Sequence, residues 1–162
     1  MRPLSDARLK EIEVLYRTRF PHFLRLATAV TGDRDTALEA VQDAFADVVR
    51  GRRAFRGEGP LEAWVWRAVV NAARKARPPA FQPTALDPAT RTNGSEPAPP
   101  SELTPLIAAL PERQRLALFL RYYADLDYRS IAATLDVELG TVSATLSSAH
   151  TALRRALREV PE

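Results

Sequence analysis

A proline-rich stretch between Pro78 and Ser101 is the feature that most limits how this chain can fold. It holds seven of the 13 prolines, together with Asn-Gly, Ser and Thr, and no periodic apolar pattern runs through it. Each proline removes a backbone hydrogen-bond donor and biases the residue before it away from the helical conformation. We therefore expect a flexible, fairly extended linker between two small domains, residues 1–77 and residues 102–162, each with its own core.

Before this linker, apolar residues recur at helical spacing and predict several helices. A first helix is expected over Asp6–Arg19. A second should begin at Pro21 and end at Gly32, because glycine is common just past the C-terminus of a helix. Asp33 or Asp35 can cap a third helix. The apolar stripe of that third helix consists of Ala37, Ala40, Val41, Ala44, Phe45 and Val48.

The remaining apolar segments are also predicted to be helical. Pro60 suits the first turn of a fourth helix, with an apolar stripe of Leu61, Trp64, Val65, Ala68, Val69 and Ala72. Pro111 starts a helix that buries Leu116, Phe119, Leu120 and Tyr123. A short helix over Tyr128–Leu135, a turn at Asp136–Leu139 and a final helix from about Gly140 follow, the last burying Val142, Leu146, Ala149, Leu153 and Leu157. Since no strand pattern appears, the predicted fold class is all-α.

The composition argues against several classes of protein. The chain has no cysteine, which removes disulfides, thiol catalysis and thiolate zinc sites, and its two histidines make a histidine-rich metal site unexpected. We find no glycine-rich phosphate loop, HExxH motif or nucleophile elbow, so we expect neither an enzyme nor a cofactor. No apolar run approaches the ~20 residues of a membrane span, and the N-terminus lacks a signal-peptide core. The expected location is the cytoplasm.

An acidic ridge follows the third predicted helix. Its members recur every four residues and therefore share one helix face: Asp35, Glu39, Asp43 and Asp47. A run of charge is usually a solvated face. Like charges at this spacing nevertheless repel one another, so the acidic ridge also suits a basic partner.

The fourth predicted helix carries basic and polar residues at matching spacing. Arg67, Asn71 and Arg74 lie on one face, and Trp66 stands off the apolar stripe. Arginine neutralises phosphates, asparagine can hydrogen-bond a base edge, and an indole can stack on an unpaired base. These residues therefore suit a nucleic-acid surface, with burial of Trp66 as the alternative. Residues 1–77 contain 15 basic and 10 acidic residues, so the positive charge of the chain is concentrated here.

The segment from Leu126 to His150 has the spacing of a helix-turn-helix, yet no Lys or Arg occurs from Ser130 to Leu153. Residues 102–162 as a whole hold seven basic and eight acidic residues. Counterion release by basic side chains supplies most of the affinity for DNA. We therefore expect a helix-turn-helix with a weak grip on DNA.

Three stretches in this order make the chain resemble an extracytoplasmic-function sigma factor, a bacterial transcription initiation factor with two helical domains and a linker. The region that binds core RNA polymerase in the family is similar to YRTRFPHFLRLATAVTGDRDTALEAVQDAFADVV. The minus-ten promoter region is similar to FRGEGPLEAWVWRAVVNAARKAR. The C-terminal domain, which reads the minus-thirty-five element, resembles LPERQRLALFLRYYADLDYRSIAATLDVELGTVSATLSSAHTALRRAL.

The resemblance implies three sets of site residues. Core polymerase binding is carried over to Glu39, Gln42 and Asp43, and the four-residue spacing adds Asp47. Minus-ten DNA binding is carried over to the fourth helix and the basic loop before it, at Arg56, Trp66, Arg67, Asn71, Arg74 and Lys75. Minus-thirty-five binding is carried over to Arg129, Thr141, Ser143, Thr145, Ser147, His150 and Arg154. The implied partners are core RNA polymerase, promoter DNA and an anti-sigma factor.

Two departures from the family pattern keep a second interpretation open. The family often has a polar residue where this chain has Val70, and the exposed positions of its reading helix usually include Lys or Arg. Here those positions are Ser143, Thr145, Ser147, Ser148 and His150. The alternative is a sigma-like adaptor that binds polymerase or another regulator with little specific recognition of DNA.

Overall fold

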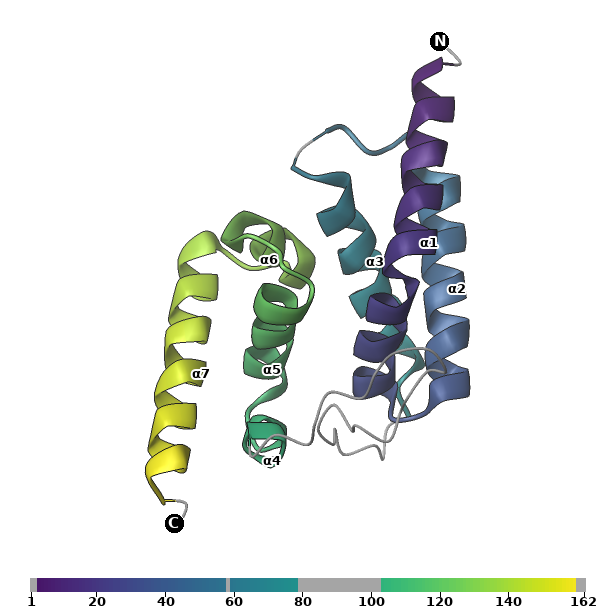
Figure 1. The fold of residues 1–162 in the computed structure, drawn as a ribbon. Helices are drawn as coiled ribbons and strands as arrows, with labels where there is room; N and C mark the ends of the chain where they lie inside the picture. Colours follow the sequence, from purple (N-terminus) through teal and green to yellow (C-terminus); the bar gives the residue numbers. More distant parts are fainter. Residues whose placement is uncertain (1–2, 58, 79–102, 160–162) are drawn as a thin grey trace.

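The computed structural model describes residues 3–57, 59–78 and 103–159, and every regular element within these ranges is a helix (Figure 1). The all-α prediction is therefore confirmed. The predicted linker, apart from Pro78, lies outside the described residues. Two groups of helices stand side by side, one formed by the first three helices and the other by the last ones (Figure 1). Within the described ranges, no helix is both long and apolar enough to cross a membrane.

The first helix is longer than the sequence predicted. Helix α1 runs without a break over Pro3–Thr31, with Pro21 inside it. The prediction of two helices was wrong because a proline removes only one hydrogen bond from a helix, and both halves of α1 bury apolar residues against the same neighbours. Ile12 lies in the first half, and Phe23 and Leu26 lie in the second, all with at most 2% of their surface exposed. The predicted end at Gly32 is confirmed, with Gly32 at a φ of 81°.

Helix α2, Arg34–Gly51, follows the prediction closely. Its buried residues are the six of the predicted stripe. Asp33 is the N-cap, and its carboxylate accepts hydrogen bonds from the backbone N–H of Thr36 at 2.9 Å and from the Thr36 hydroxyl at 2.7 Å. These bonds favour the charged form, the one from the hydroxyl most, and they lower the pKa of Asp33.

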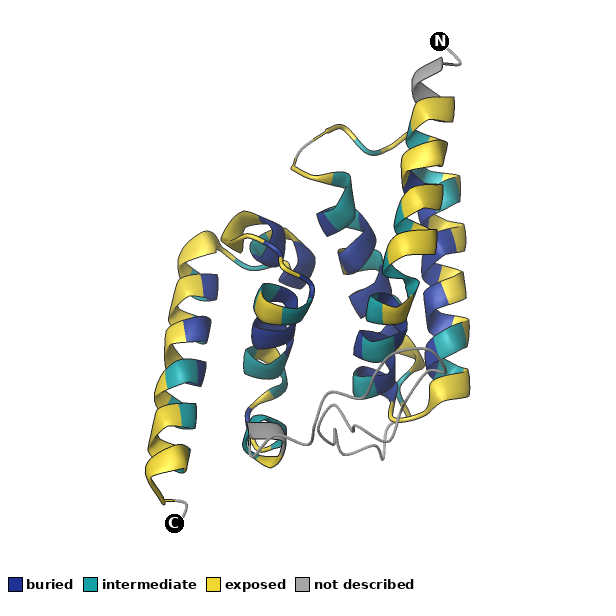
Figure 2. Ribbon diagram, viewed as in Figure 1, coloured by how far each residue is buried: buried dark blue, intermediate teal, exposed yellow. Residues whose placement is uncertain are grey.

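Helix α3, Leu61–Ala76, buries a broader face than predicted. Val65 and Val69 are buried as expected, but Trp64 is only half-buried, whereas Trp66 is fully buried. Its indole packs on Phe23 with ring centroids 4.3 Å apart and on Phe119 at 6.1 Å. The prediction assumed one apolar stripe that faces one core. In the structure α3 is covered on two sides, by α1 and α2 and by the second group of helices (Figure 2).

The second group contains the predicted helices and two further features. Helices α5 (Glu112–Leu118), α6 (Tyr128–Leu135) and α7 (Leu139–Glu159) were expected, and α6 has the predicted bounds. A short helix, α4 (Leu103–Ala108), was not. Helix α5 continues into one turn of π-helix, η1 (Phe119–Tyr123). The predicted buried residues of α7 are confirmed at Val142, Leu146 and Ala149, whereas Leu153 is half-buried and Leu157 is 42% exposed.

The turn between α6 and α7 has the geometry of a helix-turn-helix. Asp136 ends α6 in the left-handed conformation, with φ of 56° and ψ of 50°, at the start of the predicted turn. At the other end of α6, the Asp127 carboxylate accepts a 2.7 Å hydrogen bond from the backbone N–H of Ser130. That bond lowers the pKa of Asp127. Both ends of the short helix α6 are thus fixed by local chemistry.

The two groups of helices touch along α3, which packs against α6 and, through Arg74, forms an ion pair with Glu112 at the start of α5. The Thr134 hydroxyl of α6 donates a 3.3 Å hydrogen bond to the carbonyl oxygen of Ala63, and both residues are buried. Beside this contact, the imidazole of His22 on α1 stacks on Tyr123, with ring centroids 4.7 Å apart. Burial there, helped by the nearby positive charge of Arg19 and Arg25, lowers the pKa of His22. We refer to this contact between the two groups as the interdomain face.

Candidate functional site

The acidic ridge lies on the solvent side of α2. Glu39, Gln42, Asp43 and Asp47 are all exposed, opposite the buried stripe of the helix. Asp47 forms an exposed ion pair with Arg50, which partly neutralises the end of the ridge. Glu39 and Asp43 are exposed at i, i+4 spacing, so two negative charges point to the same side of the helix. The helix therefore presents a charged surface without any need for further folding.

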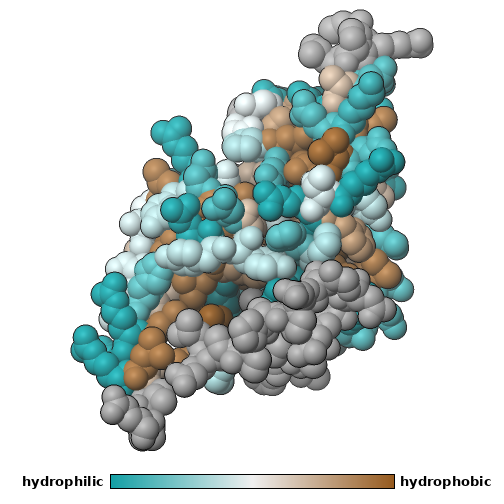
Figure 3. All heavy atoms as spheres, viewed as in Figure 1, coloured by the Kyte–Doolittle hydropathy of each residue, from teal (hydrophilic) through white to brown (hydrophobic). Residues whose placement is uncertain are grey.

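A groove that the sequence did not predict lies next to this ridge, between α1 and α2. It is lined by Leu9, Ile12, Glu13, Tyr16, Phe45, Ala46, Val49 and Arg50. Leu9 and Tyr16 are large apolar side chains with 38% and 36% of their surface exposed, and Figure 3 shows apolar surface along the N-terminal part of α1. The seven-residue spacing of Leu9 and Tyr16, which places them on one helix face, is the sequence pattern from which this groove could have been predicted. Ala46 lies on the same side of α2 as Asp43, so acidic and apolar surface adjoin.

The basic and polar residues predicted on α3, together with Arg77 after its end, divide into two sets. Asn71 and Lys75 are exposed to solvent. Arg67 lies 3.5 Å from Asp136 of the helix-turn-helix turn, and Arg74 and Arg77 both pair with Glu112, Arg74 at 4.0 Å and Arg77 at 2.5 Å. The predicted nucleic-acid surface of α3 is therefore largely turned toward α5 and α6. Trp66, placed in that surface from the sequence, is 0% exposed and cannot stack on a base in this arrangement.

The loop between α2 and α3, described at residues 52–57, 59 and 60, is called the arginine loop. Arg53 and Arg56 are exposed, and Arg52 is half-buried, with a 2.6 Å hydrogen bond from its guanidinium to the carbonyl oxygen of Val49. Gly57 and Gly59 take φ angles of 77° and 82°, which residues with a side chain rarely adopt. The predicted site residue Arg56 thus stands on a loop just before two glycine turns.

The helix-turn-helix presents a polar surface with little charge. Ser143, Ser147 and Arg154 of α7 and Arg129 of α6 are exposed, whereas Thr141, Thr145 and His150 are half-buried. Of these predicted site residues, Arg129 and Ser143 are brought together around a shallow hollow, which is lined by Asp127, Tyr128, Arg129, Leu139, Gly140 and Ser143. The imidazole Nε2 of His150 lies 2.9 Å from the hydroxyl of Tyr122, so part of its bonding capacity is used inside the protein.

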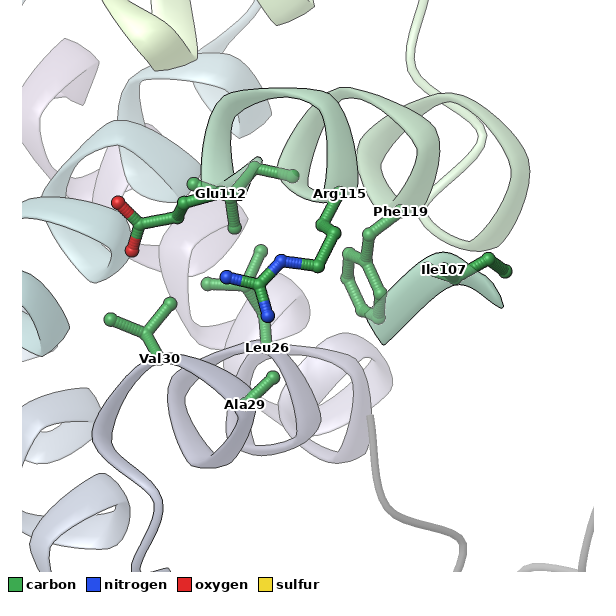
Figure 4. Close-up of a pocket in the computed structure, with 8 residues that line it drawn as sticks. Leu26, Ala29, Val30, Ile107, Glu112, Arg115 and Phe119 are labelled. Atoms are coloured by element: carbon green, nitrogen blue, oxygen red, sulfur yellow. The ribbon is translucent and has the colours of Figure 1, made fainter. Parts of the chain in front are cut away.

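A small apolar pocket lies where α1 meets α4 and α5 (Figure 4). Its lining consists of Leu26, Ala29, Val30, Ile107, Glu112, Arg115, Leu116 and Phe119. The guanidinium of Arg115 points across it toward α1, and burial lowers the pKa of this group. In the described part of the chain, no group of three His, Asp or Glu residues is placed to hold a metal ion.

Two family models match the chain in the order of its two groups of helices. The model described as Sigma-70 region 2 matches residues 15–77, and the model described as Sigma-70, region 4 matches residues 102–153. The first match contains α2, α3 and the arginine loop. The second contains α5, α6 and most of α7.

Curated relatives share the same description. The ECF RNA polymerase sigma-E factor of Escherichia coli (strain K12) is 30% identical over 134 residues, which cover 71% of this chain and 70% of that protein. The RNA polymerase sigma-H factor of Pseudomonas aeruginosa is 29% identical over 175 aligned positions, which cover 95% of this chain and 89% of that protein.

Solved structures show the same fold at lower identity. The sigma factor RpoE of Bartonella quintana, in complex with the anti-sigma factor NepR, aligns with a TM-score of 0.70 and 18% identity over 94% of this chain and 99% of that one. CnrH, in complex with the cytosolic domain of CnrY, aligns with a TM-score of 0.66 and 17% identity over 97% of this chain and 94% of that one.

Proposed function

Because the chain belongs to the extracytoplasmic-function family of RNA polymerase sigma factors, we propose that it binds core RNA polymerase, directs the enzyme to promoters and initiates transcription there. The observation that carries this proposal is the exposed pair Glu39 and Asp43 on a helix whose opposite face is a buried apolar stripe. The test is transcription in vitro with core polymerase on a library of genomic fragments. Specific transcripts that require the chain are expected, and their absence would remove the function.

We propose a division of labour between two domains, residues 1–77 and residues 102–162, joined by residues 78–101. In the first, the acidic ridge and the adjoining apolar groove of α1 and α2 form the polymerase-binding surface. The negative charges of the ridge attract and orient a basic partner, and the groove supplies apolar surface that is desolvated on binding. The arginine loop, with Asn71 and Lys75 of α3, supplies phosphate and base contacts to the non-template strand.

The domains separate when Arg67 and Arg74 also bind the DNA. Arg67, Arg74 and Arg77 are paired across the interdomain face, so promoter DNA and the C-terminal domain compete for the same side of α3. Val70 lies at the middle of that side and is fully buried. An apolar residue at this position suits packing against α6, in place of the polar residue that is common in the family.

Changing Val70 to Arg should therefore separate the two domains. Burying a guanidinium without a partner costs a large free energy, so the interdomain face should open while the helices of the chain remain. The measurement is energy transfer between dyes on two introduced cysteines, at Arg53 and Thr151, since the chain has no cysteine of its own. Ala76→Arg is the matched control, because Ala76 is exposed on the same helix. Unchanged transfer in a folded Val70→Arg chain would place Val70 in the core of the first domain alone.

In the C-terminal domain, we propose weak binding to minus-thirty-five DNA through α7. Its exposed positions include Ser143 and Ser147, which can bond to phosphates and bases but neutralise no charge. Arg129, Arg154 and Arg155 supply the flanking positive charge. Affinity for the promoter then depends strongly on polymerase and on the first domain.

A salt titration tests this weak grip. The full chain with Ser143→Arg and Ser147→Arg should bind duplex minus-thirty-five DNA more tightly than wild type. The slope of log affinity against log salt should steepen by roughly two, since each neutralised phosphate adds about one. A chain with Gln at both positions controls for side-chain size. No change in slope would mean that this side of α7 does not face the DNA.

The adaptor alternative rests on the same absence of basic residues from the first part of α7. One assay distinguishes an adaptor from a sigma factor. Promoter binding is measured for the chain with core polymerase and for polymerase alone. A sigma factor adds sequence-specific binding, whereas an adaptor binds polymerase and adds none.

We also propose an anti-sigma partner. Of the two similar solved structures, one is a complex with the anti-sigma factor NepR and the other is a complex with the cytosolic domain of CnrY. The site of action that fits all these partners is the cytoplasm.

A further inference from the structure

One arginine far from the arginine loop in sequence holds the base of that loop. Arg8 lies near the start of α1, and its Nη1 atom donates hydrogen bonds to the carbonyl oxygens of Arg52 at 2.9 Å and Phe55 at 2.8 Å. These carbonyls lie 44 and 47 residues further along the chain. Arg8 is half-buried, so the two bonds are partly shielded from water.

An aromatic stack completes this anchor. The guanidinium carbon of Arg8 lies 4.9 Å from the centre of the Phe55 ring, and that ring lies 5.3 Å from the ring of Trp64 on α3. The indole of Trp64 in turn lies beside Gly51, where an added Cβ would be 3.8 Å away. Arg8 therefore connects the start of α1, the end of α2 and the start of α3.

The contacts are made to backbone carbonyls, and the nearest charged side chains that the structure describes in this loop are arginines. Arg52, Arg53 and Arg56 repel a fourth guanidinium, so these side chains do not attract Arg8 to the loop. What the position gains is the carbonyl of Arg52, the C-cap at the negative end of α2, together with the carbonyl of Phe55 just beyond the helix. The planar guanidinium can also bond two carbonyls and stack on a ring at the same time, which an ammonium group cannot.

We propose that Arg8 is a positioning residue for promoter opening: it fixes the arginine loop so that Arg53 and Arg56 meet the non-template strand without first being ordered. The inference rests on the proposed function of this loop. Residues 52–57 lie outside the regular helices. Ordering a flexible segment on DNA costs conformational entropy, and a loop that is already fixed in the free protein avoids that cost on binding. Arg8 itself makes no contact with DNA in this proposal.

The experiment compares Arg8→Gln, Arg8→Lys and Lys10→Gln in the full chain. Lys10 is exposed two residues away, so its change removes the same charge without touching the loop. Hydrogen exchange of the free proteins is measured at the backbone amides of residues 52–57. Arg8→Gln should raise exchange there, Arg8→Lys should raise it less, and Lys10→Gln should leave it as in wild type. Unaltered exchange in Arg8→Gln overturns the anchoring, whatever the transcription assays show.

The second measurement follows promoter opening with a fluorescent base in the minus-ten region, beside the affinity for core polymerase. The opening rate should fall roughly ten-fold in Arg8→Gln, as expected for the loss of a charge-assisted hydrogen bond, while polymerase affinity stays within about two-fold. Arg8→Lys keeps the charge and should still open more slowly than wild type. Equal loss of both activities, or a Lys variant as fast as wild type, would refute positioning. If wild type opens no promoter, the proposed function fails while the exchange result still decides the anchor.

Discussion

Replacement of Trp66 by Ala is expected to destabilise the protein by about 3–5 kcal/mol, the usual loss for a large aromatic residue in a core. The indole is fully buried between Phe23 and Phe119, and its Nε1 lies 3.4 Å from a carboxylate oxygen of Glu62. Removing it leaves a cavity where α1, α3 and η1 meet. In a chain of this size the melting temperature should fall by roughly 6–20 °C, measured by circular dichroism.

Trp64→Ala is the matched control for this prediction. Trp64 lies on the same helix and has the same side chain, but it is half-buried and packs on Phe55 at the edge of the fold. Its loss should cost clearly less stability. Equal melting temperatures for the two variants would show that Trp66 is not a core residue, and would return it to the candidate DNA surface.

Reversal of two charges on the acidic ridge, Glu39→Arg together with Asp43→Arg, should weaken the binding of core polymerase by a few kcal/mol, on the order of a hundred-fold or more in affinity. Both carboxylates are exposed and share one face of α2. The fold should remain intact, because the reversal relieves repulsion between like charges on that face. The measurements are polymerase affinity by fluorescence anisotropy and thermal stability by circular dichroism.

A second charge reversal controls for the change in net charge. Glu11→Arg with Glu159→Arg alters two exposed carboxylates by the same amount outside the acidic ridge. This chain should bind polymerase nearly as wild type does. If the ridge variant also binds as wild type and is folded, the polymerase-binding surface lies elsewhere, and the apolar groove between α1 and α2 becomes the first place to look.

Helices with one buried face could be predicted well from the sequence. The stripe of α2 was found because a single 3.6-residue period describes the whole helix, and Asp33, one of the two aspartates predicted as its cap, is the N-cap. The same reasoning failed for α3, since a helix covered from two sides shows two overlapping stripes. It also failed at Pro21, where packing on either side outweighs one missing hydrogen bond.

The candidate sites were predicted only as far as local spacing reaches. Glu39 and Asp43 share a helix face by spacing alone, and their exposure then follows from the stripe opposite. The pairing of Arg74 and Arg77 with Glu112 joins residues across the linker, so no periodic pattern encodes it. Arg8 is similar, because its partners are backbone carbonyls and a sequence does not show which carbonyls a fold leaves accessible.

The two-sided burial of α3 has a consequence for the newly made chain. Synthesis runs from the N-terminus at about 5–20 residues per second, so the first three helices exist for several seconds before α5 and α6 are complete. During that time the side of α3 that later meets Thr134 and Phe119 has no cover. A nascent chain held at this stage presents apolar surface that chaperones recognise, and its release from them depends on the arrival of the last third of the protein.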